Sequence, residues 1–421
     1  MNDNVYDRIF DKKRKLIIIG ILGAPINNGN MGCVALTYAL LTMLEKISAD
    51  LNITFCYYIF EGVEDVKKNA ILCQKLSIEE KKVKSFNIYP VESILGLCHR
   101  PYKVIETYSA LKDCNLFIDL TQGDSFSDIY GNTVFIKNAN GKRLIEKRIK
   151  KPLILGPQTF GPYQSLKNMK IAKKIVERAD LVIARDVAST QYIKTFSDKK
   201  VYTTTDLAFN LPYKKDKLKN KNEKVKVGVN VSGLLSQNKL ESTPTKFRLK
   251  TNYDEYIDTL LIWLIDNDYD VSFVPHVIAD YECEKKVAKK FPQVKVIEMY
   301  ENPIDIKSEI SKFDIFIGGR MHATIGAFSS GVATIPTAYS RKFNGLYKNI
   351  GYSYVIDLLN LSTEESLERT KIYIENYSEL KTAAMQGMKK INELENKTES
   401  LFREQIVKMM NKLSEQGMRI L

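Results

Sequence analysis

The residues with the clearest chemical potential are a cation and an imidazole, Arg320 and His322, directly after the glycine pair at 318–319. An arginine is a permanent planar cation that suits a carboxylate or a phosphate, and a histidine can give or take a proton near neutral pH. A β-rich apolar run at 314–317 precedes them, and a helix-compatible run follows to Gly331. This order predicts a strand, a tight turn and a helix, so both side chains stand where open parallel sheets bind ligands, often anions.

Two further cations follow predicted strands. Lys342 comes after the strand that follows the His322 helix, and neighbouring parallel strands present their carboxyl ends to one crevice. We therefore expect Lys342 to converge with Arg320 and His322. In the first half of the chain Arg185 ends another predicted strand, and two interpretations of it stay open. It faces a ligand, or it forms an ion pair with a nearby aspartate, Asp186 or Asp206.

A polar loop at residues 23–32, with three glycines and three asparagines, lies between an apolar run at 15–22 and a predicted helix. Backbone N–H groups and amide side chains of such a loop can cradle a phosphate or a sugar hydroxyl, which makes Asn28 and Asn30 candidate binding residues. Plain turn chemistry is the other interpretation. A dinucleotide fingerprint is not present, because the loop lacks G-x-G-x-x-G.

A second polar cluster covers residues 121–128, at the end of a buried strand predicted at 115–120. Asp124 and Asp128 are four positions apart and share a face only if a helix begins there. Their roles stay open between a helix cap with a first-turn carboxylate and hydroxyl binding or general-base catalysis. Gln158 lies in a further strand-end loop, held in shape by two prolines and a glycine.

Predicted strands alternate with helices on both sides of a lysine-rich stretch at residues 213–226, which has the composition of a solvated linker. At 421 residues the chain is longer than one core usually supports. We therefore predict an α/β fold with domains at 1–212 and 227–361. Charged helices at 362–421 carry an apolar stripe that we expect to pack on the body, with contact to a membrane surface as the alternative.

The net charge of +13 favours an acidic partner: a phosphorylated small molecule, nucleic acid or an anionic membrane. The apolar stretch at 16–26 is broken by glycines and a proline and is too short to cross a bilayer, so a cytoplasmic location is expected. The six cysteines form no C-x-x-C pair, and are expected to be reduced and buried. The three histidines are well separated, and no metal site is recognisable.

A set of short motifs, spread over most of the chain, resembles the polysaccharide pyruvyl transferase family in its order and spacing. The motifs are NGNMG at 28–32, QGD at 122–124, YG at 130–131, GPQTFGP at 156–162, ARD at 184–186, TDLAF at 205–209, GRMHA at 319–323 and AYSRKF at 338–343. The resemblance implies two Rossmann-like domains facing across a cleft, as in glycosyltransferases of the B type. It also implies transfer of pyruvate from phosphoenolpyruvate to a sugar of a cell-surface glycan or its lipid-linked precursor, giving a ketal and phosphate.

By this resemblance His322 matches the family's proposed general acid, and Arg320 with the backbone at Met321 matches its phosphoenolpyruvate-binding neighbours. Arg185 corresponds to a second donor-binding arginine, and Lys342 to a basic residue near the donor. The second domain would hold the donor, and the first domain the acceptor. The acceptor candidates are Asn28, Asn30, Asp124 and Gln158. Where the family often has GGD this chain has QGD, so a side chain in place of a glycine can reshape the acceptor pocket.

The implied chemistry suits these residue types. Phosphoenolpyruvate carries a carboxylate and a phosphate on a small carbon frame, so cations are needed to hold it. A protonated His322 can protonate the methylene carbon, which makes C2 open to attack by a sugar hydroxyl, and such help is typically worth about 10²–10⁴ in rate. Asp124 is the candidate base for a second hydroxyl. No metal or other cofactor is required, although a divalent ion could assist.

Two other function classes stay open. A B-type glycosyltransferase or sugar-nucleotide epimerase would need a base pocket and a carboxylate on the ribose, for which the His322 domain offers no clear candidate. A non-enzymatic glycan- or nucleic-acid-binding protein would spread its affinity over surface lysines, and this affinity would fall steeply with salt. The pyruvyl transferase interpretation expects a glycan or lipid-linked oligosaccharide, contact with the inner face of a membrane, and no nucleic acid.

Overall fold

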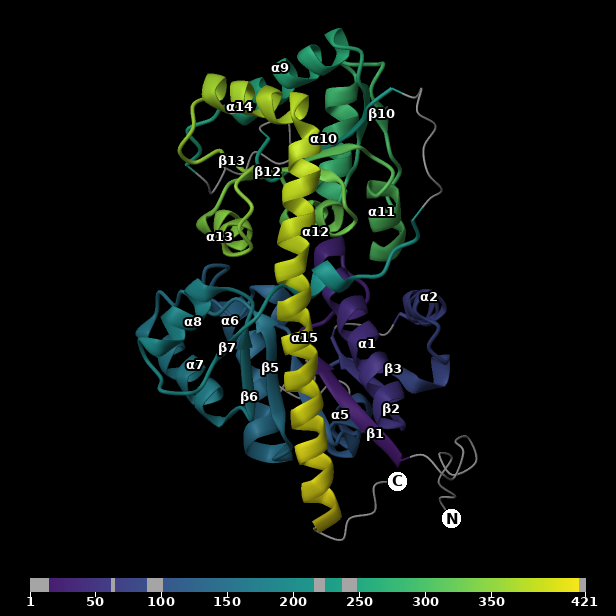
Figure 1. The fold of residues 1–421 in the computed structure, drawn as a ribbon. Coiled ribbons are helices and arrows are strands. Elements are labelled where there is room, and N and C mark those ends of the chain that lie inside the picture. The colour runs from purple at the N-terminus through teal and green to yellow at the C-terminus, as the bar shows by residue number, and fades with distance from the viewer. Residues whose placement is uncertain (1–14, 62–64, 89–100, 216–223, 237–247, 416–421) are drawn as a thin grey trace. The chain divides into compact units, whose positions relative to one another are not determined.

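The computed structural model describes residues 15–61, 65–88, 101–215, 224–236 and 248–415, which form two compact units (Figure 1). Unit 1 comprises Met1–Asn27, Leu40–Asp206 and Asn396–Leu421, and unit 2 comprises Asn28–Ala39 and Leu207–Glu395. Each unit has a parallel sheet and a hydrophobic core of its own.

The sheet of unit 1 has seven parallel strands in the order β3-β2-β1-β4-β5-β6-β7. They are β1 Lys15–Leu22, β2 Ile53–Phe60, β3 Val83–Phe86, β4 Leu116–Asp119, β5 Leu153–Gln158, β6 Leu181–Ala184 and β7 Tyr202–Thr203. The central strands β2, β4, β5 and β6 are buried along their whole length, as parallel strands covered by helices on both faces require. Helices wholly within this unit are α2 Val66–Leu76, α5 Pro101–Asp113, α6 Asn132–Leu144, α7 Leu166–Arg178 and α8 Val187–Lys194.

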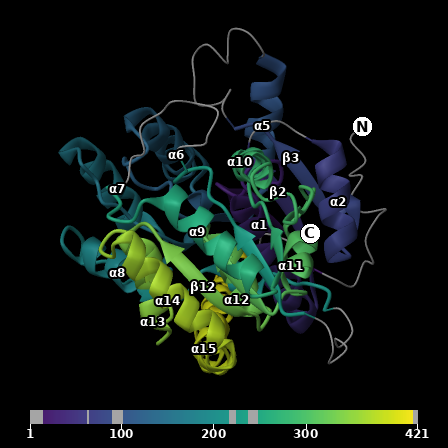
Figure 2. The ribbon, with the colours of Figure 1, turned by 90° about the horizontal axis from the view of Figure 1, so that it is seen from above.

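The sheet of unit 2 has six parallel strands in the order β10-β9-β8-β11-β12-β13. They are β8 Lys226–Asn230, β9 Asp270–Phe273, β10 Lys295–Val296, β11 Ile315–Gly318, β12 Ala333–Ala338 and β13 Ile356–Asp357. Its helices are α9 Tyr253–Asp266, α10 Ile278–Ala288, α11 Pro303–Ile310, α12 Met321–Ser329, α13 Arg341–Asn349 and α14 Thr363–Glu375. Helices α9 and α14 lie side by side (Figure 2), with the hydroxyls of Tyr256 and Thr370 2.8 Å apart.

In both sheets the strand order reverses next to the first strand of the unit, between β1 and β4 and between β8 and β11. This doubly wound order is the Rossmann order, and ligands bind beyond the carboxyl ends of strands at such a reversal. The predicted α/β class with two Rossmann-like domains is therefore confirmed.

The boundary between the units lies at Asp206 and Leu207, slightly before the predicted end of the first domain at 212. The turn Leu207–Asn210 belongs to unit 2 because its Phe209 ring packs edge-to-face on Phe328 of α12. The buried ammonium of Lys307 also donates to the carbonyl oxygens of Phe209 and Leu211. Of the predicted linker at 213–226, residues 216–223 lie outside the described part of the chain.

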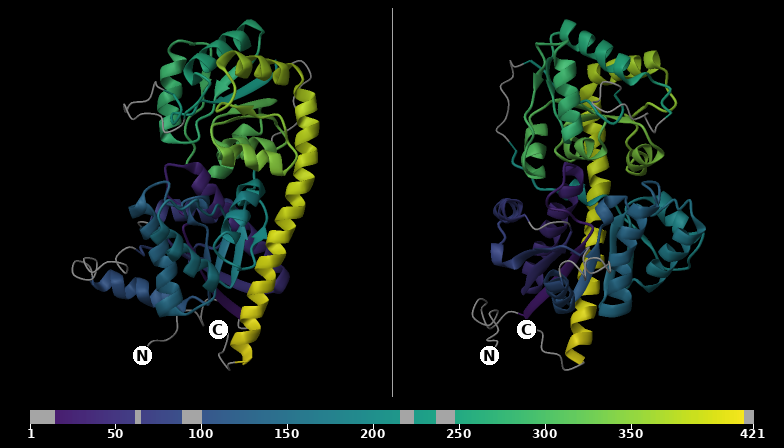
Figure 3. Two further views of the ribbon diagram at one scale, coloured as in Figure 1. Left: turned by 90° about the vertical axis from the view of Figure 1, so that its left-hand side faces the viewer. Right: turned by 180° about the vertical axis from the view of Figure 1, so that it is seen from behind.

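Two helices contribute residues to both units: α1, Met31–Leu51, and α15, Tyr377–Glu415, which is one uninterrupted helix (Figure 3). Of the described helices, α1 is long and apolar enough to cross a bilayer, but most of it is buried inside the protein. Arg403 of α15 forms an ion pair with Asp50 at the end of α1, within unit 1.

The apolar stripe predicted for the C-terminal helices packs on the body. Five of its side chains are buried, and the other three are partly exposed. The buried ones are Ile391, Leu401, Phe402, Ile406 and Met409; the others are Leu394, Met410 and Leu413. This confirms packing as the role of the stripe and leaves it little surface for a membrane. The five cysteines in the described ranges are free and buried, as expected, and Cys98 lies outside those ranges.

Candidate functional site

The carboxyl ends of β9, β8, β11 and β12 lie next to one another in the sheet of unit 2. The chain continues from them into His276, Ser232, Arg320 and Ser340, so these four residues follow neighbouring strands. The predicted strand, turn and helix around Arg320 are confirmed, since β11 ends at Gly318 and α12 begins at Met321. The site can therefore be built from this edge of the sheet.

Arg320 is held by a carboxylate that the sequence analysis missed. Its Nε lies 3.0 and 3.1 Å from the two carboxylate oxygens of Asp280 on α10, and its Nη2 lies 2.7 Å from Oδ1. Asp280 is fully buried and also accepts the backbone N–H of Gly233 at 2.9 Å. Burial alone would lower the pKa of Arg320, but the Asp280 carboxylate outweighs it and the net shift is upward. The guanidinium is thus a fixed cation at a defined position.

The side-chain amide of Asn230, at the end of β8, ties the turn together. Its Oδ1 accepts the backbone N–H of Arg320 at 3.0 Å, and its Nδ2 donates to the carbonyl oxygen of Val274 at 3.1 Å. Glu284, one turn after Asp280 on α10, accepts the backbone N–H of Val231 at 3.0 Å. Burial, followed by the charge of Asp280, raises the pKa of Glu284 well above its usual range.

His322 lies in the first turn of α12 and is partly exposed. Its ring lies directly against Gly32, where a Cβ atom would come within 2.3 Å of the ring Nδ1 and 2.8 Å of the His322 Cβ. Only a residue without a side chain allows this approach. The glycine and asparagine loop at 28–32 is therefore part of the same site in unit 2 as His322, although the two are far apart in sequence.

The loop at 28–32 is shaped by its own side chains. Asn28 Oδ1 accepts the backbone N–H of Asn30 at 2.8 Å, and Asn30 Oδ1 accepts that of Gly32 at 3.0 Å. The backbone N–H of Met31 donates to the carbonyl oxygen of His276 at 3.4 Å. These contacts are the turn chemistry that was one of the two interpretations, and acceptor contact by Asn28 and Asn30 stays a prediction.

His276 is the second imidazole of this site. Its side chain is buried, and neither ring nitrogen has a hydrogen-bond partner among the described residues. Burial, then the nearby His322 and Arg320, lowers the pKa of His276 to about 3. The imidazole is therefore neutral at neutral pH, and it adds no positive charge beside His322.

Lys342 lies in the first turn of α13, which Ser340 caps by accepting the backbone N–H of Phe343. The position of its side chain lies outside the described part of the structure. Its convergence with Arg320 and His322 stays a prediction, and so does that of Arg185, which belongs to unit 1.

In unit 1, Arg185 forms the ion pair that was one of its two interpretations. Its Nη1 lies 2.5 Å from Asp206 Oδ2, and its Nε donates to Thr159 Oγ1 at 2.9 Å. Asp186 instead caps α8 by accepting the backbone N–H of Ser189. Burial would lower the pKa of Arg185, but the carboxylates of Asp206, Asp124 and Asp186 raise it overall. The buried Nη2 of Arg185 has no partner among the described residues.

Asp124 and Asp128 do not share a helical face, because α6 begins only at Asn132. Asp128 is buried and accepts the backbone N–H groups of Gln164 and Ser165, so it supports the start of α7. Burial raises the pKa of Asp128, but these hydrogen bonds lower it overall. Asp124 is partly exposed and accepts the hydroxyl of Tyr130 at 2.9 Å.

Gln158 is fully buried at the end of β5. Its Nε2 donates to the backbone oxygen and to the Oδ2 of Asp119, both at 3.1 Å. Asp119 in turn forms a buried ion pair with Lys142 at 2.9 Å. In this structure Gln158 supports the end of β4, and its contact with an acceptor stays a prediction.

The described residues contain no group of three or more His, Cys, Asp or Glu side chains that could hold a metal ion. The loop after β8 lies partly outside the described ranges. Unit 2 therefore has a fixed cation close to an imidazole, a combination that suits anion binding. Unit 1, taken by itself, has the buried Arg185 and the partly exposed Asp124.

The family model for polysaccharide pyruvyl transferases matches residues 30–341. Among solved structures, UDP-GlcNAc 2-epimerase from Neisseria meningitidis bound to UDP-GlcNAc is similar over 93% of this chain and 100% of its own, with 12% identity and a TM-score of 0.55. S. aureus MnaA with UDP is similar over 88% and 91%, with 12% identity and a TM-score of 0.55. Anabaena Alr3699/HepE with UDP and glucose is similar over 94% and 99%, with 14% identity and a TM-score of 0.52. No curated protein shows significant sequence similarity to the chain. At these identities the structural likeness shows the fold alone, which is that of B-type glycosyltransferases and epimerases.

Proposed function

Because this chain belongs to the polysaccharide pyruvyl transferase family, we propose that it transfers pyruvate from phosphoenolpyruvate to a sugar of a cell-surface polysaccharide or its lipid-linked precursor. The products are a pyruvyl ketal and phosphate. The observation that carries the proposal is the placement of His322 in the first turn of α12, two residues after the fixed guanidinium of Arg320. This pair supplies an anion-binding group and a proton donor on one rigid turn.

The start of α12 suits an anionic donor. Within the described part of the chain no side chain caps this helix, so its first N–H groups point toward the same edge of the sheet as Arg320. The helix dipole and these donors favour negative charge at this point. Arg320 adds a full positive charge whose position is set by Asp280. The carboxylate and phosphate of phosphoenolpyruvate match these two kinds of donor.

In the proposed reaction His322 gives its proton to the methylene carbon of phosphoenolpyruvate, and one sugar hydroxyl attacks C2. A second hydroxyl of the same sugar then displaces phosphate, so one hydroxyl proton replaces the proton of His322 and the other leaves with phosphate. Arg320 and Lys342 stabilise the negative charge on the departing phosphate. Asp124 is the proposed base, and Arg185 the second donor-binding cation.

The neutral state of His276 assists this step. A second imidazolium beside His322 would repel a proton on that ring, and the neutral ring of His276 adds no such repulsion. Asn28, Asn30 and Gln158 are the proposed contacts to the acceptor. The scheme needs no cofactor, a divalent ion could assist it, and we place the protein in the cytoplasm.

The test is to incubate the protein with phosphoenolpyruvate and a panel of lipid-linked or synthetic glycosides, and to follow phosphate release and the mass gain of one pyruvyl unit. The His322→Ala variant should lose about 10²–10⁴ in rate while keeping its fold. Arg320→Lys should weaken donor use because the planar fork is lost, whereas Lys215→Arg on the connection between the units should not. Unaltered turnover in both site variants, or stabilisation by a UDP-sugar and not by phosphoenolpyruvate, would overturn the proposal.

A further inference from the structure

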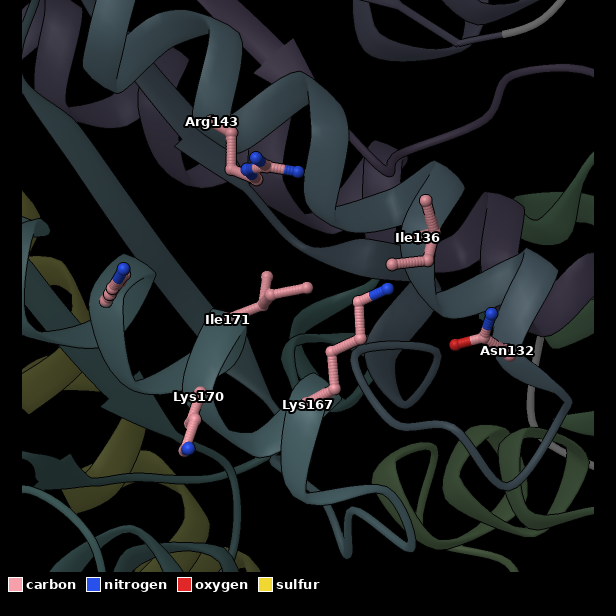
Figure 4. Close-up of a pocket in the computed structure, with 7 residues that line it drawn as sticks. Asn132, Ile136, Arg143, Lys167, Lys170 and Ile171 are labelled. Atoms are coloured by element: carbon pink, nitrogen blue, oxygen red, sulfur yellow. The ribbon is translucent and has the colours of Figure 1, made fainter.

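A second candidate site lies in unit 1, on the pair of helices that follow β4 and β5. A pocket of about 750 Å³ lies between α6 and α7 (Figure 4). It is lined by two isoleucines, an asparagine and four basic residues: Ile136, Ile171, Asn132, Arg143, Lys167, Lys170 and Lys174. Figure 4 shows Lys167 and Ile171 extending from α7 toward α6. The lining contains no carboxylate.

The lysines of this pocket are not neutralised by the protein. Within the described part of the chain, Lys167, Lys170 and Lys174 have no ion-pair partner, and all three are exposed. The acidic side chains of the neighbourhood are engaged elsewhere: Glu177 with Lys173, and Glu146 with Arg178. Four cations without a counter-charge attract an anion into the pocket.

Positive charge is concentrated in and around α6 and α7. Residues 132–151 and 166–180, which include α6 and α7, contain twelve Lys and Arg against three Asp and Glu. Their net charge of +9 compares with +13 for the 421 residues of the protein. These two helices and the residues next to them therefore carry a large excess of positive charge, as the lysine-rich stretch at 213–226 also does.

Apolar side chains are exposed at the start of the same two helices. Leu166, the first residue of α7, is 71% exposed, and Val134 in the first turn of α6 is 38% exposed. Tyr130, just before α6, is also exposed. Both helices follow parallel strands of one sheet, so their first turns lie at the same edge of it. Exposed apolar side chains next to a basic pocket are the pattern of a protein that rests on an anionic membrane.

We propose that the α6–α7 pocket binds the phosphate head group of an anionic lipid and so docks unit 1 on a membrane surface. The cations would hold the phosphate, Ile136 and Ile171 would contact the glycerol or chain carbons, and Leu166 and Val134 would enter the boundary between head groups and acyl chains. A soluble phosphate would leave these apolar side chains unused. A single-stranded nucleic acid would need aromatic residues on which bases stack, and none lines the pocket.

The experiment is co-sedimentation of the full chain with vesicles of phosphatidylcholine, with and without phosphatidylglycerol. Each lysine near an anionic surface strengthens binding about fivefold, so replacing Lys167, Lys170 and Lys174 with Gln should weaken binding to the anionic vesicles about 100-fold. A matched control replaces three exposed lysines of unit 2 with Gln, Lys289, Lys295 and Lys348, and should lose far less. Leu166→Ser should weaken vesicle binding several-fold.

The outcomes separate the sources of phosphate. Equal losses in the two triple variants would show that the charge acts diffusely, and would refute a specific pocket. The pocket would belong to a soluble anion if inorganic phosphate stabilised the wild type but not the pocket variant, and if the wild type did not bind vesicles. That result would overturn the proposal. Binding of single-stranded RNA in preference to anionic vesicles would also overturn it. Vesicle binding requires no turnover, so this result is independent of the proposed reaction.

Discussion

Replacing Gly32 with Ala tests whether the loop at 28–32 positions His322. The new Cβ would lie 2.3 Å from Nδ1, 2.5 Å from Cγ and 2.8 Å from Cβ of His322. Atoms of this kind do not approach within 3.0 Å, and the contact with Cβ involves the base of the side chain and not its flexible end. The imidazole or the helix start must therefore move by about 1 Å, and a 1 Å misplacement can reduce a catalytic rate about 10²-fold.

The expected loss corresponds to about 2.7 kcal/mol of transition-state stabilisation. The free energy of unfolding should fall by less than this amount. Crowding of this kind costs about 1–3 kcal/mol, but Gly32 is the second residue of α1, where Ala gains up to about 1 kcal/mol in helix propensity. The backbone of Gly32 does not need a positive φ, so the effect comes from contact with the ring and not from backbone strain.

The assay compares kcat/KM for phosphate release from phosphoenolpyruvate with the midpoint of urea unfolding. Gly29→Ala is the matched control in the same loop, because its Cβ would meet only Ile278 Cδ1 at the ordinary distance of 3.7 Å. Gly29→Ala should retain activity within about threefold, which is a difference of about 0.7 kcal/mol. If Gly32→Ala retained the activity of the control, the inference that the loop positions the imidazole would be wrong.

The remaining predictions concern buried groups of unit 2. Asp280→Asn should lower the free energy of unfolding, measured with urea, by about 3 kcal/mol, because the substitution leaves the guanidinium of Arg320 without its countercharge. The control Asp258→Asn breaks an exposed pair with Lys290 and should change the free energy of unfolding by less than about 1 kcal/mol. His276→Leu removes no hydrogen bond that the described residues show, and should change stability at neutral pH by less than about 1.5 kcal/mol. The pKa of His276 is about 3 in the folded protein and about 6.5 for an ordinary histidine, so between these values the unfolded chain binds a proton that the folded protein does not. The wild type should therefore lose about 1.4 kcal/mol of stability per pH unit as the pH falls through that window. His276→Leu should remove this part of the slope, and an unchanged acid-unfolding profile would contradict the assignment.

Local patterns were sufficient to predict the two sheets and the turn at Arg320. Runs of apolar β-rich residues ending in glycine identify buried parallel strands and their carboxyl ends. Ligand-binding side chains are then expected at the edge of the sheet that these carboxyl ends form. The site of unit 2 was found in this way because Arg320 and His322 lie within one such turn.

The partners of these residues were not predictable from local patterns. Asp280 lies on α10, where a carboxylate in the first turn of a helix ordinarily suggests a solvated position or a favourable dipole interaction. Only the packing of α10 against the sheet reveals that this carboxylate is fully buried against Arg320. Asp280 and Glu284, four positions apart on one helix, could have been recognised as a pair sharing a face, but not as buried.

The arrangement at Asp124 was also not predictable, and here the reason is the backbone conformation. Thr121 and Gln122 both have positive φ values, 41° and 52°, which neither residue type favours. The backbone therefore turns sharply after β4 and the helix begins only at Asn132, so Asp124 and Asp128 do not share the face that an earlier helix start would have given them. Long-range packing also decided that residues 28–39 belong with unit 2, which placed Gly32 beside His322.

The ion pair between Arg320 and Asp280 also limits how an anionic donor can be held. Asp280 engages Nε and one N–H of Nη2, so one of the two forks of the guanidinium is occupied. The fork formed by Nη1 and the other N–H of Nη2 is left for an incoming anion, and the first N–H groups of α12 can meet its other oxygens. Arg320→Lys should then weaken donor binding by more than the loss of one hydrogen bond would. A lysine ammonium could not contact both Asp280 and the donor along two directions in one plane. The role of Asp280 can be tested with the double variant Arg320→Lys with Asp280→Asn. If Asp280 serves only to orient the guanidinium, the double variant should bind the donor as well as the single variant Arg320→Lys does.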